Sequence, residues 1–430
     1  MKSQSYQIRD PIHGVIFASF GERAVIETPA FQRLRHIKQV GFADFAFPSA
    51  THTRYSHSLG AMFMASRIFD RVLPLDRMNS FERNRMRQAV RLAALLHDIG
   101  HPPLSHTTET IMPLLSRLDA SSPEGVRATH EDFTLKILLD SPLTKIIEDN
   151  FSEYQLSPRA IASLLSDRLP CDGFVACDKD FSPVLRQIIS SEIDADRMDY
   201  LLRDSFFCGV NYGKFDADWL VENLIGVEHE EQVFLGLKAR AIFAFEDFLL
   251  SRYHMFLSVY LHHTPVIMEK MLQRFFAECP EAFVLPADVV DYLLLSDLDM
   301  WQALRKSQNV WAQKIVQNRP YVVLDERVYA AKENAAIKVR HDDILHALKS
   351  RGIDAIMSQS QGVISKYAGV NKSPLFVEDG QNRYLPLEEA SPLFVRYQSP
   401  AELTRIFVDG NDKLEADDIM REVAQLSVHS

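Results

Sequence analysis

Cysteine is scarce in this sequence and follows no pattern. The 430 residues contain four cysteines, and none of them forms a CxxC pair: Cys171, Cys177, Cys208 and Cys279. So few thiols make no disulfide framework for a chain of this size, and they disfavour a structural zinc site. We therefore expect a reduced, cytoplasmic protein.

Long apolar runs and a basic excess are also missing. No stretch stays apolar for the length that a bilayer requires, and the N-terminal MKSQSYQIRD has no apolar signal core, so we expect no membrane partner. The formal net charge of −11 creates no global basic field, which disfavours nucleic acid as a partner. The best local candidate for a basic groove is RNRMRQAVR (83–91), but its arginines spread around a helix as on a solvated face.

Helical periodicity dominates the chain up to about residue 275. Three expected helices carry an apolar stripe that continues into polar residues of the metal-binding type. The stripes are His57, Ala61, Met64 and Ile68; Met86, Val90, Ala93 and His97; and Ile189, Ile193, Asp196, Tyr200 and Asp204, in a helix that begins at Ser182-Pro183. Because each polar residue continues a buried stripe, we expect it to point inward.

The texture changes after residue 275. PYVVLDERVY (320–329) and PLFVRYQ (392–398) are typical of strands, whereas DDILHALKS (342–350) is typical of a helix. The sequence therefore predicts a mainly α fold with two regions: a helical domain at 1–275 and a smaller C-terminal α+β region of unknown purpose at 276–430.

Four residues stand out as a group: His57, the adjacent pair His97-Asp98, and Asp196. Any one of them alone is explained as well by a core histidine or a solvated aspartate. Together, two imidazoles and two carboxylates form a good ligand set for Mn²⁺, Fe²⁺, Ni²⁺ or Zn²⁺, and a poorer one for Mg²⁺. His97 and Asp98 can reach one ion only near a helix end, and Gly100 with the prolines that follow it supplies such an end.

The ordered pattern His…His-Asp…Asp resembles the signature of the HD metal-dependent phosphohydrolase superfamily. The surrounding segments look like the deoxynucleoside triphosphate (dNTP) triphosphohydrolases within it. Seven blocks carry this resemblance in order: DPIHGVI (10–16), ETPAFQRLRHIKQVG (27–41), HTRYSHSLG (52–60), LLHDIGHPPLSH (95–106), THE (129–131), DADRMDYLLRDS (194–205) and SRYHMFLSVYLHH (251–263). The resemblance implies an HD-type helical core over roughly residues 8–265.

The resemblance also implies a reaction and a role for each matching residue. Water attacks the α-phosphorus of a dNTP and releases deoxynucleoside and tripolyphosphate. The implied metal ligands are His57, His97, Asp98 and Asp196. The implied catalytic group is His101, His106, Glu109 and His130. The implied substrate contacts are Arg54 and Arg252 at the phosphates, Tyr260 under the deoxyribose, Gln39 at the 3′-hydroxyl, and Tyr200 and Asp204 beside them.

Partners are less well defined by the sequence. The family suggests a homo-oligomer, and Glu27, Gln32 and Arg35 are compatible with a nucleotide-effector site. Tyr6, Gln7 and Ile8, before Asp10, do not reproduce the basic residue that the resemblance would require for an effector triphosphate, so the sequence does not support activation.

Two other functions stay open. One is an HD phosphodiesterase, nucleotidase or exonuclease that acts on other nucleotides or on nucleic acid. The other is a non-catalytic protein that binds nucleotides or single-stranded nucleic acid. The complete ligand set argues against the latter, because a protein that only binds has no need to activate water.

Overall fold

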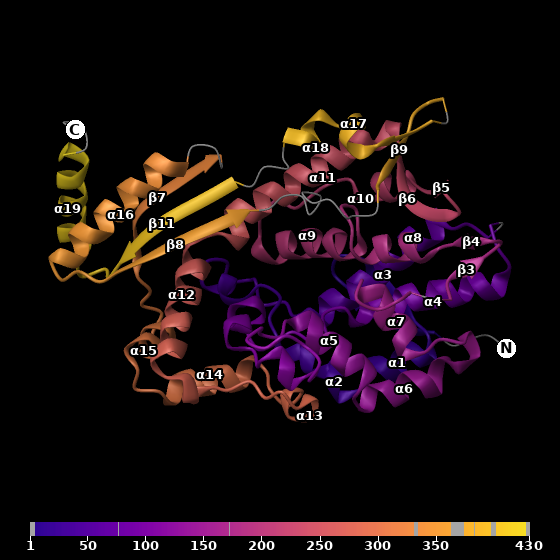
Figure 1. The fold of residues 1–430 in the computed structure, drawn as a ribbon, viewed down its shortest axis with the longest axis horizontal. Coiled ribbons are helices and arrows are strands. Elements are labelled where there is room, and N and C mark those ends of the chain that lie inside the picture. Colours follow the sequence, from indigo (N-terminus) through magenta and orange to yellow (C-terminus); the bar gives the residue numbers. More distant parts are fainter. Residues whose placement is uncertain are drawn as a thin grey trace.

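The computed structural model describes residues 5–75, 77–171, 173–330, 334–362, 374–381, 383–396 and 401–426. Most of these residues lie in helices, and the strands form small sheets (Figure 1). The prediction of a mainly α fold is therefore confirmed. No helix in the described ranges has both the length and the apolar composition needed to cross a bilayer.

Helix α3 (Arg54–Val72) forms the centre of the helical body, where it packs against α4 (Ser80–Leu96) and α9 (Ala195–Cys208). The stripe from His57 to Ile68 is buried along α3, and the apolar residues of the second stripe are buried along α4. Both helices therefore bury the faces that their periodicity predicts. Further helices pack around this centre: α1 (Phe20–Ile26), α2 (Pro29–Gln32), α5 (His130–Leu139), α6 (Pro142–Phe151) and α7 (Pro158–Leu165).

The prediction of one continuous helix over 182–204 is wrong. The chain forms α8 (Ser182–Ile189), leaves the helical conformation at Ser190, and begins again as α9. Asp194 causes the new start, because its carboxylate accepts a backbone N–H of the first turn of α9 at 2.7 Å. As a result, Asp196 lies in the first turn of a helix and not in its middle.

Strands also occur within the predicted helical body. Strands β1 (Tyr6–Asp10) and β2 (Gly14–Ala18) form a hairpin. A second sheet is built around β6 (Gln232–Lys238), which pairs with β5 (Leu224–His229) in antiparallel and with β9 (Phe376–Glu378) in parallel orientation. The same sheet includes β3 (Val175–Ala176), β4 (Lys179–Asp180) and β10 (Tyr384–Pro386).

The C-terminal region is joined to the helical body in two ways. Strand β9 completes the body's sheet, and residue 275 lies inside helix α12 (His263–Glu278). The helices after α12 continue along the same side of the molecule in Figure 1: α13 (Val289–Tyr292), α14 (Asp297–Lys306) and α15 (Val310–Val316). A division at 275/276 would cut a helix, and it stays a prediction.

A separate three-stranded sheet forms the rest of the C-terminal region. Its antiparallel order is β7 (Val322–Ala330), β11 (Ala401–Val408) and β8 (Ala355–Gly362), with β11 in the centre. Helices α16 (Asn334–Ser350) and α19 (Lys413–Leu426) pack together on this sheet (Figure 1). The predicted strand at 320–329 and the predicted helix at 342–350 are thus confirmed.

The predicted strand at 392–398 is wrong. Residues Pro392–Arg396 form helix α18, whereas 397 and 398 lie outside the described residues. Proline at the first helical position favours a helix start, and the Ser391 hydroxyl accepts the N–H of Phe394 at 3.1 Å. Local capping therefore overrides the apolar pattern that suggested a strand. Helix α18 follows α17 (Leu387–Ala390) and packs on α11 (Ile242–Met255). Strands β5 and β6 separate α11 from the preceding helix α10 (Ala217–Glu222).

Candidate metal centre and substrate cavity

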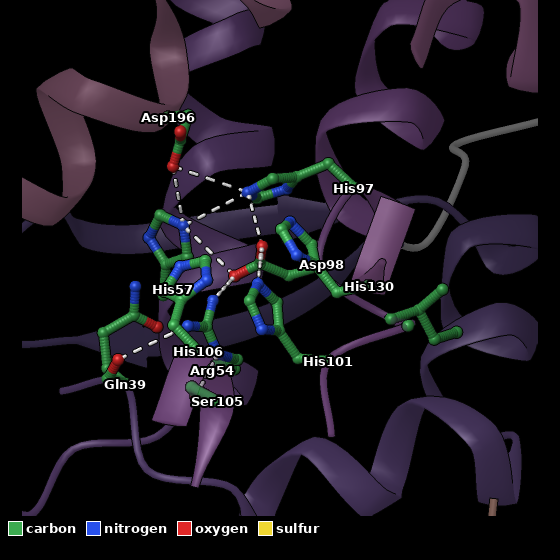
Figure 2. A network of polar contacts seen from close by, with 12 residues as sticks. Gln39, Arg54, His57, His97, Asp98, His101, Ser105, His106, His130 and Asp196 are labelled. Atoms are coloured by element: carbon green, nitrogen blue, oxygen red, sulfur yellow. Dashed lines mark hydrogen bonds and ion pairs between the residues drawn. The ribbon is translucent and has the colours of Figure 1, made fainter. Parts of the chain in front are cut away.

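Four side chains from three helices converge at one point (Figure 2). His57 lies in the first turns of α3, His97 and Asp98 directly follow α4, and Asp196 lies in the first turn of α9. The chain turns sharply after Asp98 where α5 approaches. A Cβ atom at Gly100 would collide with the backbone of α5, so a glycine is required for this close packing.

The donor atoms of these four residues lie close together. His57 Nε2 is 3.3 Å from His97 Nε2, 3.0 Å from Asp196 Oδ1 and 3.7 Å from Asp98 Oδ2. His97 Nε2 is 3.4 Å from Asp196 Oδ1 and 3.3 Å from Asp98 Oδ1. Ligands that bind one ion at about 2.0–2.2 Å lie about 3.0–3.6 Å from their neighbours. His57, His97 and Asp98 are therefore close enough to share one divalent ion, and Asp196 Oδ1 lies within this range of both imidazoles.

The charge balance of this cluster also suits a cation. Burial alone would lower the pKa of His57, but the hydrogen bonds that His57 donates to Asp196 and Asp199 raise it to about 10. Burial would raise the pKa of the Asp196 carboxyl, yet His57 and His97 hold it below its usual range. The carboxylates thus draw positive charge inward, and His57, His97 and Asp98 are grouped closely enough to hold a metal ion. Nitrogen and oxygen donors without a thiolate suit the Mn²⁺-to-Zn²⁺ series named above.

A buried carboxylate orients His57 from behind. Asp199 Oδ2 lies 2.8 Å from His57 Nδ1, where it can accept the N–H of this nitrogen, so Nε2 is the ring atom that a metal would bind in place of a proton. Arg203 donates to both oxygens of Asp199 at 2.8 and 2.9 Å, and His13 Nε2 lies 2.6 Å from Oδ1. Only a glycine at position 60 leaves room for this arrangement, because a Cβ atom there would collide with Asp199 Oδ1.

Arg54 places a cation directly beside the metal centre. Its Nη1 donates to Asp98 Oδ2 at 2.5 Å, and its Nε donates to the Ser105 hydroxyl at 2.8 Å (Figure 2). Burial would raise the pKa of Asp98, but Arg54 and His97 hold it well below its usual value. Arg54 also lines the cavity described below, so its charge can act on an anion bound there.

Three histidines and one glutamate form a second polar group next to the metal centre. The rings of His101 and His130 stack with centroids 3.9 Å apart, and the ring of His106 meets both edge-on. Glu109 Oε1 lies 2.5 Å from His130 Nδ1 and 3.2 Å from His106 Nδ1. Burial would raise the pKa of Glu109, but hydrogen bonds from His106 and His130 lower it to about 2. Glu109 is therefore an anion shared by two imidazoles.

One cavity of about 540 Å³ connects both groups. The cavity is also lined by Tyr260, whose hydroxyl donates to Asp204 Oδ2 at 2.7 Å, and by Tyr200, whose ring lies 6.2 Å from that of Tyr260. Asp204 is fixed in turn by His52 Nε2 at 2.7 Å. Gln39 also lines the cavity, and its buried Oε1 has no hydrogen-bond partner among the described residues. The sequence-predicted substrate residues are thus brought together, with one exception.

The exception is Arg252. It is buried with its Nη1 3.5 Å from Glu192 Oε2, its guanidinium lies over the ring of Phe256, and it is not among the residues that line the cavity. Arg197 approaches the same Glu192 oxygen at 3.7 Å. A phosphate clamp at Arg252 would require this guanidinium to turn away from Glu192, and the role stays a prediction.

The arginines Arg83, Arg87 and Arg91 of the basic segment 83–91 form ion pairs with carboxylates of this chain. Arg83 and Arg87 both donate to Asp70, and Arg91 is buried against Glu22 at 2.5 Å. Arginines that are paired in this way do not form a free basic groove. The expectation of a solvated face is wrong for Arg83 and Arg91, which are buried.

Sequence reasoning missed three residues of the site. His13 and Asp199 lie within the quoted family segments, but only the fold shows that they meet behind His57. Glu269 on α12 lines the cavity and accepts the Thr107 hydroxyl at 3.3 Å. Burial raises the pKa of Glu269 to about 7. A carboxylate on an otherwise apolar helix face was the only signal in the sequence.

Replacing Asp199 by Asn should weaken metal binding by about 10- to 100-fold, because the neutral amide no longer fixes the orientation and basicity of His57. Isothermal titration of the folded variant with Mn²⁺ measures the effect. Asp140→Asn is the matched control, since Asp140 forms an ion pair at the surface with Lys136, its one ion-pair partner in the described part of the chain. Unchanged affinity in the Asp199 variant would contradict the orienting role.

Replacing Glu269 by Gln should stabilise the protein at alkaline pH. The folded state raises the pKa of Glu269 from 4.5 to about 7, so the native protein loses stability as the pH rises from about 4.5 to 7. The amide does not titrate, so the Gln variant has no such loss. Between pH 4.5 and pH 8, we expect the free energy of unfolding of the variant to rise by about 2 kcal/mol relative to that of the native protein. Urea unfolding at both pH values tests this. Glu131→Gln, an exposed residue of the same cavity, should show no such gain.

Comparisons with known proteins agree with this geometry. The family described as HD domain matches residues 54–204, and the HD associated region matches residues 215–373. An uncharacterized protein of Methanocaldococcus jannaschii is 34% identical over 314 residues, which cover 73% of this chain and 58% of that protein. The chain spans little more than half the length of several curated relatives that it matches, this one included.

Two further relatives match nearly the whole chain. A Dictyostelium discoideum protein named deoxynucleoside triphosphate triphosphohydrolase SAMHD1 homolog is 27% identical over 435 residues, covering 96% of this chain and 79% of that protein. The crystal structure of a hypothetical protein from Aquifex aeolicus superposes with a TM-score of 0.76 at 28% identity, over 97% of this chain and 100% of that chain. With its HD-domain match on the helices that carry the His-Asp cluster, the chain belongs to the family of HD-domain phosphohydrolases with an HD associated region.

Proposed function

We propose that this protein hydrolyses dNTPs to deoxynucleosides and tripolyphosphate. The observation that carries the proposal is that one cavity is lined both by residues of the candidate metal cluster and by polar side chains that can contact a sugar. The cluster lies on α3, on α9 and directly after α4. The polar side chains that can contact the sugar are Gln39, Asp204 and Tyr260. The name of the Dictyostelium relative, which matches 96% of this chain, supports the same reaction.

His57, His97, Asp98 and Asp196 would hold the divalent ion. When bound, such an ion supplies Lewis acidity, which draws charge from phosphoryl oxygens and makes water more acidic. Arg54, fixed by Asp98 and Ser105, offers its cation to the phosphates on the cavity side. A fixed positive charge of this kind suits a triphosphate whose oxygens gain charge as water adds to the α-phosphorus.

The histidine group would handle the protons of the reaction. As water adds to the α-phosphorus and the bond to the 5′-oxygen breaks, that oxygen must take up a proton. His106 lines the cavity with its Nδ1 3.2 Å from Glu109 Oε1, so its ring is positioned to supply this proton as a general acid. His130 contacts the same Glu109 carboxylate. His101 stacks on the His130 ring, and its Nε2 lies 3.3 Å from Asp98 Oδ1.

Tyr260 and Gln39, which also line the cavity, would select the sugar. Tyr260 is tied to Asp204 through its hydroxyl, so its ring has a fixed position in the cavity. A ring held against C2′ rejects a ribose hydroxyl by steric conflict. The free carbonyl oxygen of Gln39 suits a 3′-hydroxyl, which would satisfy this buried acceptor.

Two expectations about partners accompany this proposal. Gln32 Oε1 accepts the Nε–H of Arg35 at 2.7 Å, and Glu27 pairs with Arg23, which lies just before the segment where the family resemblance suggests an effector nucleotide. Homo-oligomer formation and binding of an effector stay predictions, and activation by an effector can be read from the assay below when a second nucleotide is added.

The proposal is tested by incubating the purified protein with Mn²⁺ and each of the four dNTPs. Chromatography should show deoxynucleoside and tripolyphosphate in equal amounts. Release of inorganic phosphate or pyrophosphate would contradict the proposed reaction. Hydrolysis of cyclic nucleotides or of single-stranded DNA, with no turnover of dNTPs, would favour the other HD activities.

Replacing Glu109 by Gln should lower kcat by about 100-fold or more with little change in KM, since it removes the charge that holds the proton on His106. Because the pKa of Glu109 is about 2, the native carboxylate is ionised throughout the range of the assay, and the loss should not be recovered at higher pH. Glu131→Gln, beside His130 in the same cavity, should retain native kcat. A Glu109 variant with native kcat would exclude the proton-handling role.

A further inference from the structure

The segment that carries Tyr260 has an unusual backbone. Helix α11 continues into a π-helical turn at Phe256–Tyr260, which ends where the Leu261 N–H donates to the Phe256 carbonyl at 2.8 Å. Such wide turns are rare and occur frequently at functional sites. Tyr260 is the last residue of this turn, so its position depends on how the end of the turn is held.

A buried arginine of the C-terminal sheet holds that end. Arg405 lies in the central strand β11 and donates from Nη1 to the Leu261 carbonyl at 2.6 Å. Its Nε donates to Glu326 Oε2 at 2.5 Å, and Glu326 is its direct neighbour on β7. Arg405 is 4% exposed, so these two partners compensate the cost of burying its charge.

This contact is strong and directional. A carbonyl at the end of a helix has no partner within the helix, and a charged donor satisfies it better than a neutral one. Leu261 directly follows Tyr260, and the Tyr260 hydroxyl is bound to Asp204 on α9. The tyrosine is thereby held at two points, at its backbone by the C-terminal sheet and at its hydroxyl by the helical body.

We propose that Arg405 is a positioning residue, which ties the C-terminal sheet to the turn of Tyr260 and so sets the distance between this ring and the sugar. The inference rests on the proposed function, in which Tyr260 contacts the deoxyribose. It assigns a purpose to the C-terminal region: the sheet supports one wall of the substrate cavity from a distance.

The test compares Arg405→Gln with Arg327→Gln in the full chain. Arg327 is a matched control, because it lies in the same sheet but pairs only with Asp325 among the described residues. We expect the Arg405 variant to raise KM for dNTPs by about tenfold or more, with a smaller change in kcat, and to hydrolyse ribonucleoside triphosphates relatively better. Arg405→Lys should recover part of the selectivity, since it keeps one charged donor.

Hydrogen exchange gives a second measurement that does not depend on turnover. Amides of residues 256–262 should exchange faster in the Arg405 variant than in the native protein, and at the native rate in the Arg327 variant. Equal loss of activity on deoxy and ribo substrates in both variants, or unchanged exchange at 256–262, would overturn the inference. Faster exchange with unchanged sugar selectivity would also overturn it. A native protein that turns over no dNTP would instead refute the proposed function, and exchange would still decide whether Arg405 holds the turn.

Discussion

The ion pair between Asp199 and Arg203 underlies the whole metal centre. Both side chains are fully buried, and neither charge could be tolerated there without the other. Arg203 also donates to Asp10, and Asp199 also meets His13, so the pair ties the β1–β2 hairpin to α3 and α9. Asp199 also accepts a hydrogen bond from His57 Nδ1. The interaction that joins these elements therefore fixes the orientation of the imidazole, with Nε2 as the atom that would bind a metal.

Charge is arranged in layers from this pair to the cavity. Behind the centre, an arginine neutralises the carboxylate that orients His57. Within the centre, the carboxylates of Asp98 and Asp196 attract positive charge, so the cluster favours a cation. At the cavity wall, Arg54 restores positive charge where an anionic substrate would lie. The glutamate shared by His106 and His130 adds a separate site of negative charge that can hold a proton on an imidazole. Each layer can exist in a mostly buried site because the next one compensates it.

The C-terminal region takes part in this arrangement from outside. Strand β9 pairs with β6 in a sheet of the helical body, and Arg405 of β11 donates to the turn that carries Tyr260. None of these contacts involves residues that are close in sequence. The cavity is therefore a product of the whole described chain, although the metal-binding side chains all come from its helical part.

The sequence by itself determined which residues have the chemistry of the site. Inward stripes placed His57 and His97 in the core, and their residue types, together with Asp98 and Asp196, indicated a metal, because periodicity and ligand chemistry are local properties. The break before α9 and the helix at 392–396 were misjudged, since side-chain caps at Asp194 and Ser391 override an apolar pattern. Only the tertiary structure decided that Asp199 and His13 meet behind His57, that Arg252 faces Glu192 and not the cavity, and that Arg405 reaches Leu261. These contacts join residues 60 to 186 positions apart, and no periodicity or spacing in a sequence records which distant carboxylate a buried cation will meet.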